Sequence, residues 1–259
     1  MPQITSFTSP AGYLIDMDGV LNRGNTPVTH AREFIARLQQ RNIPFLLLTN
    51  HSCDTPVQLQ RKMAGMGMEI ELEQFYSAAI ATAHWLSDQG ARRVYAIGRE
   101  GLFDALERYD IERCESDVSH VVVGFSRHLD YDQFKLAMRL IKAGAQFVGT
   151  NPDPTYPVED GEAPECGLLL GALQGVTGQA PLIVGKPEAI IYHQAASRLG
   201  LPLENLTMIG DRLDTDIIGA LGVGAQSILV LTGHTTREIL TQSAIVPHRV
   251  LENLSELEV

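Results

Sequence analysis

Short apolar runs alternate with amphipathic stretches along most of the chain, and this alternation constrains the fold more than any other feature. Residues 12–15 and 43–48 are apolar runs typical of strands buried on both faces. The stretch between them, residues 29–40, has helical spacing, with an apolar face made by Ala31, Phe34, Ile35 and Leu38. Further strands are predicted at residues 93–97, 120–123, 146–149, 182–184, 206–209 and 226–231. Strands that alternate with helices in this way predict βαβ units, and therefore an α/β fold with a mainly parallel sheet.

Composition excludes several classes of protein. The 259 residues carry a net charge of −11, which disfavours binding to nucleic acid or to an anionic membrane surface. No run of 18 apolar residues is present, and residues 1–8 lack the basic and apolar segments of a secretory leader. The three cysteines are widely spaced, which favours reduced thiols and a cytoplasmic protein over a disulfide framework.

The first strand runs directly into two carboxylates, Asp16 and Asp18. In open α/β sheets, ligands bind at the carboxyl ends of the strands, so we expect both acids to face the binding crevice. Two like charges that are buried together need a cation between them, or one of them must keep its proton. This segment is therefore the first candidate for chemistry, although Asp-x-Asp-Gly is also ordinary turn composition.

Three further segments place polar groups after apolar runs. Thr49 and Asn50 follow the second strand, where a hydroxyl, an amide and nearby backbone N–H groups suit an anion. Lys186 stands between a glycine and Pro187, which we expect to begin the next helix. Residues 210–217 follow another strand and contain three acids, Asp211, Asp214 and Asp216. For these we expect Asp214 to cap a helix and Asp216 to lie in its first turn, while Asp211 is left unexplained.

Together these strand ends resemble the four motifs of the haloacid dehalogenase superfamily. Within it the chain is similar to the NagD-like phosphatases of subclass IIA, in the segments DMDGVL, LLTN, TNPD, VGKP and GDRLDTDI. The resemblance implies a doubly wound, Rossmann-like core over residues 1–82 and 183–259. An α/β cap domain of the C2 type, inserted after the second motif over residues 83–182, would govern substrate access. The long gap between Thr49 and Lys186 agrees with such an insertion, because a single crossover needs far fewer residues.

The resemblance also implies a mechanism. Asp16 is the expected nucleophile on a phosphomonoester and forms an aspartyl phosphate, and Asp18 is the expected general acid and later base. Mg²⁺ is the expected cofactor, with Asp16, Asp18 through its backbone carbonyl, and Asp211 as ligands, and with Asp216 orienting them. Thr49, Asn50 and Lys186 are expected to bind the phosphate.

Several questions stay open at the level of sequence. Nucleoside monophosphates are the favoured substrates by resemblance, followed by sugar phosphates, phosphoglycolate and pyridoxal phosphate. The non-enzymatic alternative is a metal-binding module that senses a phosphometabolite. The one long stretch without periodicity, residues 151–165, is predicted to be a loop that faces the active site, and Cys166 and His51 could each contact substrate or serve only the fold. A homo-oligomer formed through the cap is a further expectation from the resemblance.

The Asp-x-Asp pair argues against the metal-free dehalogenation that names the superfamily, because that reaction lacks the second acid. The short gap between Asp18 and Thr49 leaves no room for a phosphomutase cap. A receiver domain of two-component signalling also uses acids, a Thr and a Lys around Mg²⁺, but it is about half this length and carries its acceptor Asp on a later strand.

Overall fold

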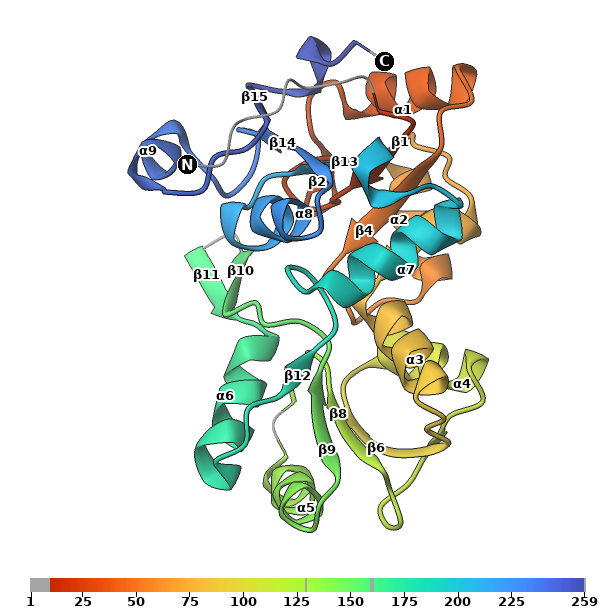
Figure 1. The fold of residues 1–259 in the computed structure, drawn as a ribbon, viewed down its shortest axis with the longest axis vertical. Helices are drawn as coiled ribbons and strands as arrows, with labels where there is room; N and C mark the ends of the chain where they lie inside the picture. The colour runs from red at the N-terminus through yellow and green to blue at the C-terminus, as the bar shows by residue number, and fades with distance from the viewer. Residues whose placement is uncertain (1–9, 129, 159–160, 259) are drawn as a thin grey trace. The chain divides into compact units, whose positions relative to one another are not determined.

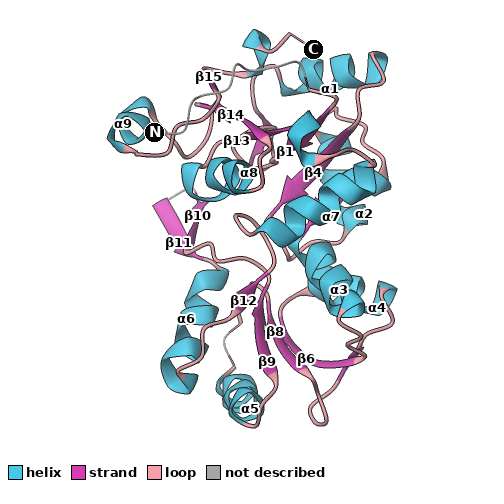
Figure 2. Cartoon of the chain, viewed as in Figure 1, coloured by secondary structure: helices cyan, strands magenta, loops and turns pink. Residues whose placement is uncertain are grey.

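A computed structural model of the chain describes residues 10–128, 130–158 and 161–258. The N-terminal segment in which no leader was expected, and residues 159 and 160 of the expected loop, lie outside this range. The chain divides into two compact units. The first comprises Met1–Thr49, Val57–Tyr76 and Lys186–Val259, and the second comprises Asn50–Pro56 and Ser77–Gly185. Both units are α/β, as the sequence predicts (Figure 2).

The first unit is built on a six-stranded sheet in the order β15-β14-β13-β1-β4-β5. The pairings β15–β14, β14–β13, β13–β1 and β1–β4 are parallel. Its strands are β1 (Gly12–Ile15), β4 (Phe45–Thr49), β5 (Phe75–Ser77), β13 (Leu206–Gly210), β14 (Gln226–Val230) and β15 (Arg249–Leu251), with a separate ribbon of β2 (Asn22–Arg23) and β3 (Thr26–Pro27). Its helices are α1 (Ala31–Gln40), α2 (Pro56–Gly65), α7 (Ala189–Leu199), α8 (Ile218–Gly222) and α9 (Arg237–Gln242), with short turns η1 (Leu72–Gln74), η2 (Leu203–Asn205), η3 (Leu213–Ile217) and η4 (Leu254–Glu256).

Both faces of this sheet are covered, as a doubly wound fold requires. Ile228 and Val230 of β14 belong to the core cluster that contains the apolar residues of α1 and α2. Leu229, between them, packs instead with Leu213 and Ile217. Successive strand residues therefore bury their side chains in opposite layers, which explains why these strands are continuous apolar runs.

The second unit has a five-stranded parallel sheet in the order β12-β9-β8-β6-β7. Its strands are β6 (Arg93–Ile97), β7 (Glu112–Arg113), β8 (His120–Val123), β9 (Gln146–Gly149) and β12 (Leu182–Ile183). One face is covered by α3 (Ala78–Asp88) and α4 (Glu100–Arg108), and the other by α5 (Tyr131–Lys142) and α6 (Cys166–Thr177) (Figure 1). The sequence placed an insertion at residues 83–182, and the unit includes in addition residues 77–82, residues 183–185 and the segment Asn50–Pro56.

Some local expectations were wrong. The segment predicted to be a loop contains an antiparallel hairpin, β10 (Thr155–Val158) with β11 (Gly161–Pro164). Neither strand buries a regular apolar face, so the hairpin leaves no period of two in the sequence. Pro187 does not begin α7, which starts at Ala189 after Glu188.

Strand and helix limits otherwise shift by a few residues at the ends, where boundaries are least certain from sequence. The first helix begins at Ala31 and not Thr29, because His30 has left-handed backbone geometry. Within the described residues, no helix combines the length and the apolar character that crossing a membrane requires.

Candidate active site

Three of the predicted residues lie at one edge of the first unit's sheet. Asp16 follows the last residue of β1, Thr49 ends β4, and Asp211 follows β13. Since β1 pairs in parallel with both β4 and β13, these carboxyl ends are neighbours. All three residues are buried. The parallel sheet therefore brings together groups that are far apart in sequence, at the edge where α/β proteins bind ligands.

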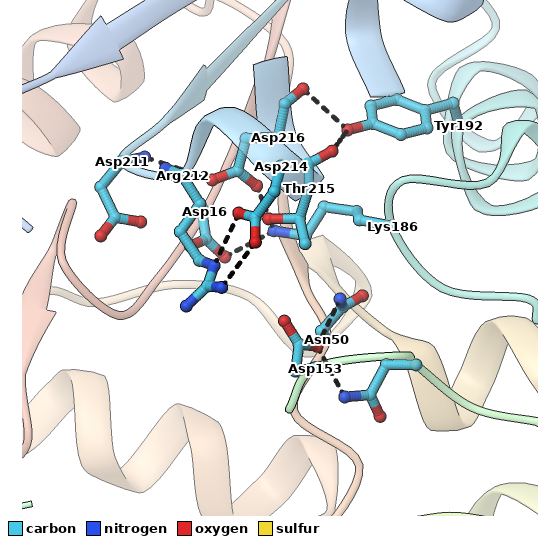
Figure 3. Close-up of polar contacts among 11 residues, drawn as sticks. Asp16, Asn50, Asp153, Lys186, Tyr192, Asp211, Arg212, Asp214, Thr215 and Asp216 are labelled. Carbon is cyan, nitrogen blue, oxygen red and sulfur yellow. Dashed lines mark hydrogen bonds and ion pairs between the residues drawn. The ribbon is translucent and has the colours of Figure 1, made fainter. Parts of the chain in front are cut away.

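Lys186 lies between two of the acids. Its Nζ donates hydrogen bonds of 2.7 Å to Asp16 Oδ1 and 2.7 Å to Asp216 Oδ1 (Figure 3). The lysine side chain is 2% exposed and that of Asp216 is fully buried. Burial alone would lower the pKa of Lys186, but the two carboxylates outweigh it and raise that pKa above its usual range. The ammonium is thus a fixed positive charge in a water-poor site.

Asp16 and Asp211 experience the opposite balance. Burial is the main cause that raises the pKa of Asp16, with a contribution from the neighbouring carboxylates, and Lys186 opposes it. Burial, together with the charge of Asp216, raises the pKa of Asp211 to about 7. Both acids therefore hold a proton more tightly than an exposed aspartate, and a bound cation would relieve the same electrostatic cost.

Asp211 has one oxygen engaged and one free. Its Oδ2 accepts the backbone N–H of His234, whereas its buried Oδ1 has no hydrogen-bond partner among the described residues. A carboxylate oxygen from each of Asp16, Asp211 and Asp216 lies within 4.8 Å of the others, close enough to share one metal ion. This free oxygen is the observation that best fits a hard divalent cation.

Both carboxylate oxygens of Asp216 accept hydrogen bonds from the protein, so this residue holds the loop after β13 and has no free oxygen to offer a metal ion. Its Oδ2 accepts the backbone N–H groups of Asp211 at 3.2 Å and Arg212 at 3.1 Å, while its Oδ1 accepts Lys186. Asp214 does not cap a helix as expected; it pairs with the Arg212 side chain at 2.9 Å and is exposed. Asp214 and Asp216 both lie in the first turn of η3, where only the position of Asp216 was expected.

Asp18 lies apart from the buried cluster. Its side chain is 49% exposed, and its Oδ1 accepts the Asn22 amide at 2.5 Å and lies 3.6 Å from Lys62 Nζ. The strand ends at Ile15, so the strict alternation that would place Asp16 and Asp18 alike on one face does not extend to Asp18. Asp16 is buried and Asp18 is not.

Three residues that the sequence did not single out shape this site. Tyr192 is fully buried, and its hydroxyl donates to the backbone carbonyls of Thr215 and Asp216 at 3.2 and 3.0 Å. Gly19 and Gly233 stand against the Asp211 carboxylate so closely that a Cβ at either position would overlap it. Gly19 also has a positive φ of 87°, which favours glycine. Gly19 belongs to the Asp-x-Asp-Gly segment of the sequence, but a helix position such as Tyr192 and a lone loop glycine such as Gly233 give no sequence signal for such contacts.

The second unit carries its own polar cluster. Asn50 donates to Asp153 Oδ2 at 2.7 Å, and Asn151 donates to the same oxygen at 2.6 Å and to Glu165 Oε2 at 2.8 Å. Burial raises the pKa of Glu165 to about 7. Thus Asn50, a predicted phosphate ligand, is engaged within this unit, whereas Thr49 belongs to the first unit.

The two residues that stayed open in the sequence also belong to this unit. Cys166 begins α6, is fully buried, and its Sγ donates to the carbonyl of Val123 at 3.5 Å. Burial raises the pKa of its thiol, so it has the environment of a structural cysteine. His51 is partly buried and pairs with Asp54 at 2.9 Å.

Known proteins are similar to this chain over both units. Residues 13–112 match the sequence family described as haloacid dehalogenase-like hydrolase, and residues 183–257 match a family described as HAD-hydrolase-like. The chain is 36% identical over 246 residues to the 5'-nucleotidase YutF of Bacillus subtilis (strain 168), covering 95% of this chain and 96% of the relative. It is 35% identical over 253 residues to an acid sugar phosphatase of Staphylococcus haemolyticus, with coverage of 95% and 96%.

Two solved structures are similar to nearly the whole chain. NagD from Escherichia coli K-12 matches with a TM-score of 0.91 and 28% identity, over 97% of this chain and 99% of that one. A p-nitrophenyl phosphatase from Archaeoglobus fulgidus matches with a TM-score of 0.91 and 30% identity, over 95% and 97%.

Proposed function

The chain belongs to the haloacid dehalogenase-like hydrolases, as a NagD-like phosphomonoester hydrolase, and from this premise we propose that Asp16 is its nucleophile. The observation that carries the proposal is the buried contact of Asp16 with Lys186. The lysine hydrogen bond falls on Oδ1, so Oδ2 is the oxygen that attacks phosphorus. The new P–O bond forms as the bond to the ester oxygen breaks, and an aspartyl phosphate results.

Asp18 supplies and removes the protons of the two steps. In the first step its carboxylic acid protonates the departing ester oxygen. In the second, the resulting carboxylate takes a proton from the water that attacks the aspartyl phosphate, so that phosphate leaves and Asp16 is restored. Its partial exposure suits this role, because the residue must exchange protons with substrate and water.

The residues present fit Mg²⁺. We assign its ligands to the Asp16 carboxylate, the backbone carbonyl of Asp18 and the unpartnered Oδ1 of Asp211. Both oxygens of Asp216 are already engaged, so this residue holds the Asp211 loop and Lys186 in place. When bound, the ion offsets the repulsion between a carboxylate and a phosphate dianion.

Thr49 and Lys186 complete the proposed phosphate site. The Thr49 hydroxyl and the neighbouring backbone N–H groups donate to phosphoryl oxygens, and the Lys186 ammonium neutralises part of their charge. Asn50 is kept as a phosphate ligand, although its amide is already engaged by Asp153.

We propose that the inserted domain, residues 83–182, is a cap domain that governs substrate access. We favour nucleoside monophosphates, in line with the relative named a 5'-nucleotidase. Sugar phosphates are the first alternative, since other relatives are named acid sugar phosphatases. Phosphoglycolate, pyridoxal phosphate and a purely sensing role come after these.

A homo-oligomer through the cap is proposed from its surface. The facing helices α5 and α6 expose Tyr131 (81%), Leu168 (48%) and Val176 (52%). Tyr131 and Leu168 line an apolar hollow of about 360 Å³. Helix α6 carries no charged residue, and a twofold interface joins the same surface patch of both copies, so two α6 helices pack against each other without like-charge repulsion. Light scattering of wild-type protein and Leu168→Glu tests this, and a monomeric wild type contradicts it.

The test of function is phosphate release from a panel of nucleotides, sugar phosphates and p-nitrophenyl phosphate, with Mg²⁺ and with a chelator. Turnover that requires Mg²⁺ and prefers one class is expected. Asp16→Asn should abolish it, whereas Asp214→Asn, an exposed acid of the same loop region, should not. Negligible release by the wild type on every compound would favour the sensing role, and activity retained by Asp16→Asn would remove the proposed nucleophile.

A further inference from the structure

The side chain of Asn22 is a buried amide that reaches the proposed general acid. Asn22 lies on β2 with no exposed surface, and its Nδ2 donates to Asp18 Oδ1 at 2.5 Å and to the carbonyl of Gly24 at 3.0 Å. Both partners are acceptors, so the opposite orientation of the amide would face oxygen with oxygen. The orientation of this side chain is therefore fixed by its neighbours.

Packing does not account for an amide at this position. The Oδ1 of Asn22 is buried and has no hydrogen-bond partner among the described residues. An unpaired buried carbonyl opposes folding, and an apolar side chain of similar size would avoid that cost. Such a replacement would lose the Nδ2 donor of Asn22, which is the group that contacts Asp18.

Short-range backbone hydrogen bonds hold the turn that leads into Asn22. The N–H of Gly19 donates to the carbonyl of Asn22 at 2.7 Å, and the N–H of Asn22 donates to that of Met17 at 3.1 Å. The turn is also tied to the loop after β14, because Thr232 Oγ1 donates to the carbonyl of Gly19 at 2.7 Å. These hydrogen bonds therefore hold the backbone of Asn22 in place next to Asp18.

Both side-chain contacts of Asp18 that the described residues provide fall on the same oxygen. Asn22 donates to Oδ1, and Lys62 of α2 lies 3.6 Å from Oδ1 with its side chain 24% exposed. The hydrogen bond is the directional contact, whereas an ion pair at that distance and exposure contributes little. We propose that Asn22 is a positioning residue that holds Oδ1 of Asp18, so that Oδ2 carries the proton to the leaving group.

This inference rests on the proposed function, in which Asp18 is the general acid. It predicts that the importance of Asn22 depends on the leaving group. When the P–O bond breaks, its electron pair stays on the ester oxygen. An alkoxide is a strong base and needs the proton from Asp18, whereas p-nitrophenolate is a weak base and departs without it. A residue with a purely structural role would affect both substrates alike.

The experiment compares kcat/KM for p-nitrophenyl phosphate and for glycerol phosphate, an alkyl ester. This parameter reports the steps through the first phosphoryl transfer, so hydrolysis of the aspartyl phosphate does not obscure the comparison. The variants are Asn22→Leu, which removes the donor at similar size, and Asn22→Ala, which removes the whole amide. Asn253→Leu is the matched control, since Asn253 caps the turn η4 and makes no contact with Asp18.

Asn22→Leu is expected to lower kcat/KM for the alkyl ester by at least about tenfold and for the aryl ester by less than about threefold, and Asn22→Ala should show the same selectivity. The control should leave the ratio of the two substrates unchanged. Equal losses on both esters, or no loss on either, would overturn the positioning role. Negligible phosphate release by the wild type from these two esters and from every nucleotide and sugar phosphate of the panel would instead overturn the proposed phosphatase function.

Discussion

Removal of the Lys186 charge is the sharpest test of the buried ion-pair cluster. Lys186→Met keeps most of the side-chain volume but leaves Asp16 and Asp216 buried without their ammonium. Removing one partner of a buried ion pair costs about 3–5 kcal/mol, because the remaining charge is uncompensated. For a protein of this size each kcal/mol shifts Tm by about 2–4 °C, so we expect a decrease of about 6–20 °C at neutral pH.

The assay is thermal and urea unfolding followed by circular dichroism without metal, with Lys62→Met as the matched control. Lys62 pairs with the half-exposed Asp18 at 3.6 Å, so its loss should cost less than about 1 kcal/mol. Adding Asp216→Asn to Lys186→Met should recover part of the loss, since it removes one of the two uncompensated charges.

At acid pH, the difference in stability between Lys186→Met and the wild type should become smaller. Burial raises the pKa of Asp16, and protonation of Asp16 removes one of the buried charges that the variant leaves uncompensated. A loss for Lys186→Met no larger than for Lys62→Met would refute the argument, since the buried cluster would then behave like a surface pair.

Three further outcomes follow from the contacts of single residues. Burial raises the pKa of Glu165 to about 7 from an unfolded value near 4.5, so the folded state binds the extra proton and stability should fall as pH rises from about 4.5 to about 7. Comparing urea unfolding of wild type and Glu165→Gln isolates this decline, and parallel curves would contradict it. Tyr192→Phe should cost about 1–2 kcal/mol and lower activity, because two buried carbonyls lose their donor; unchanged urea midpoint and kcat would contradict this. Gly233→Ala should lower Mg²⁺-dependent activity strongly, since its methyl would displace the Asp211 carboxylate, whereas Gly222→Ala, with open space at Cβ, should not; equal activity of the two variants would refute the steric argument.

The sheet could be predicted closely because its strands are buried on both faces. A strand such as β1 then buries every residue, and its limits follow from the apolar run alone. The hairpin β10–β11 could not be found in this way, since its residues are largely exposed or partly exposed. Its pairing depends on contacts between backbone groups, and these leave no pattern in the side chains.

The site could be predicted where polar groups follow apolar runs. Asp16, Thr49, Lys186 and Asp211 were chosen for that reason, and the structure buries all four in the first unit; their catalytic roles stay predictions. The contribution of Tyr192 to the site could not be predicted, because Tyr192 occupies an ordinary core position of a helix. Its hydroxyl contacts a loop that is more than 20 residues away in the sequence.

The charge of the cluster explains why so acidic a chain would need a cation to bind phosphate. Asp16, Asp211 and Asp216 bring three carboxylates together, and Lys186 is the ammonium that contacts two of them. With all groups ionised, the cluster is anionic even after the lysine is counted, and a phosphate dianion would be repelled. Protonation of a carboxylate lowers this negative charge, and the raised pKa values of Asp16 and Asp211 show that the cluster favours protonation. A protonated Asp16, however, is a poor nucleophile. A divalent cation lowers the same charge and leaves the carboxylate of Asp16 ionised, so metal binding and nucleophile activation are expected to depend on one electrostatic balance.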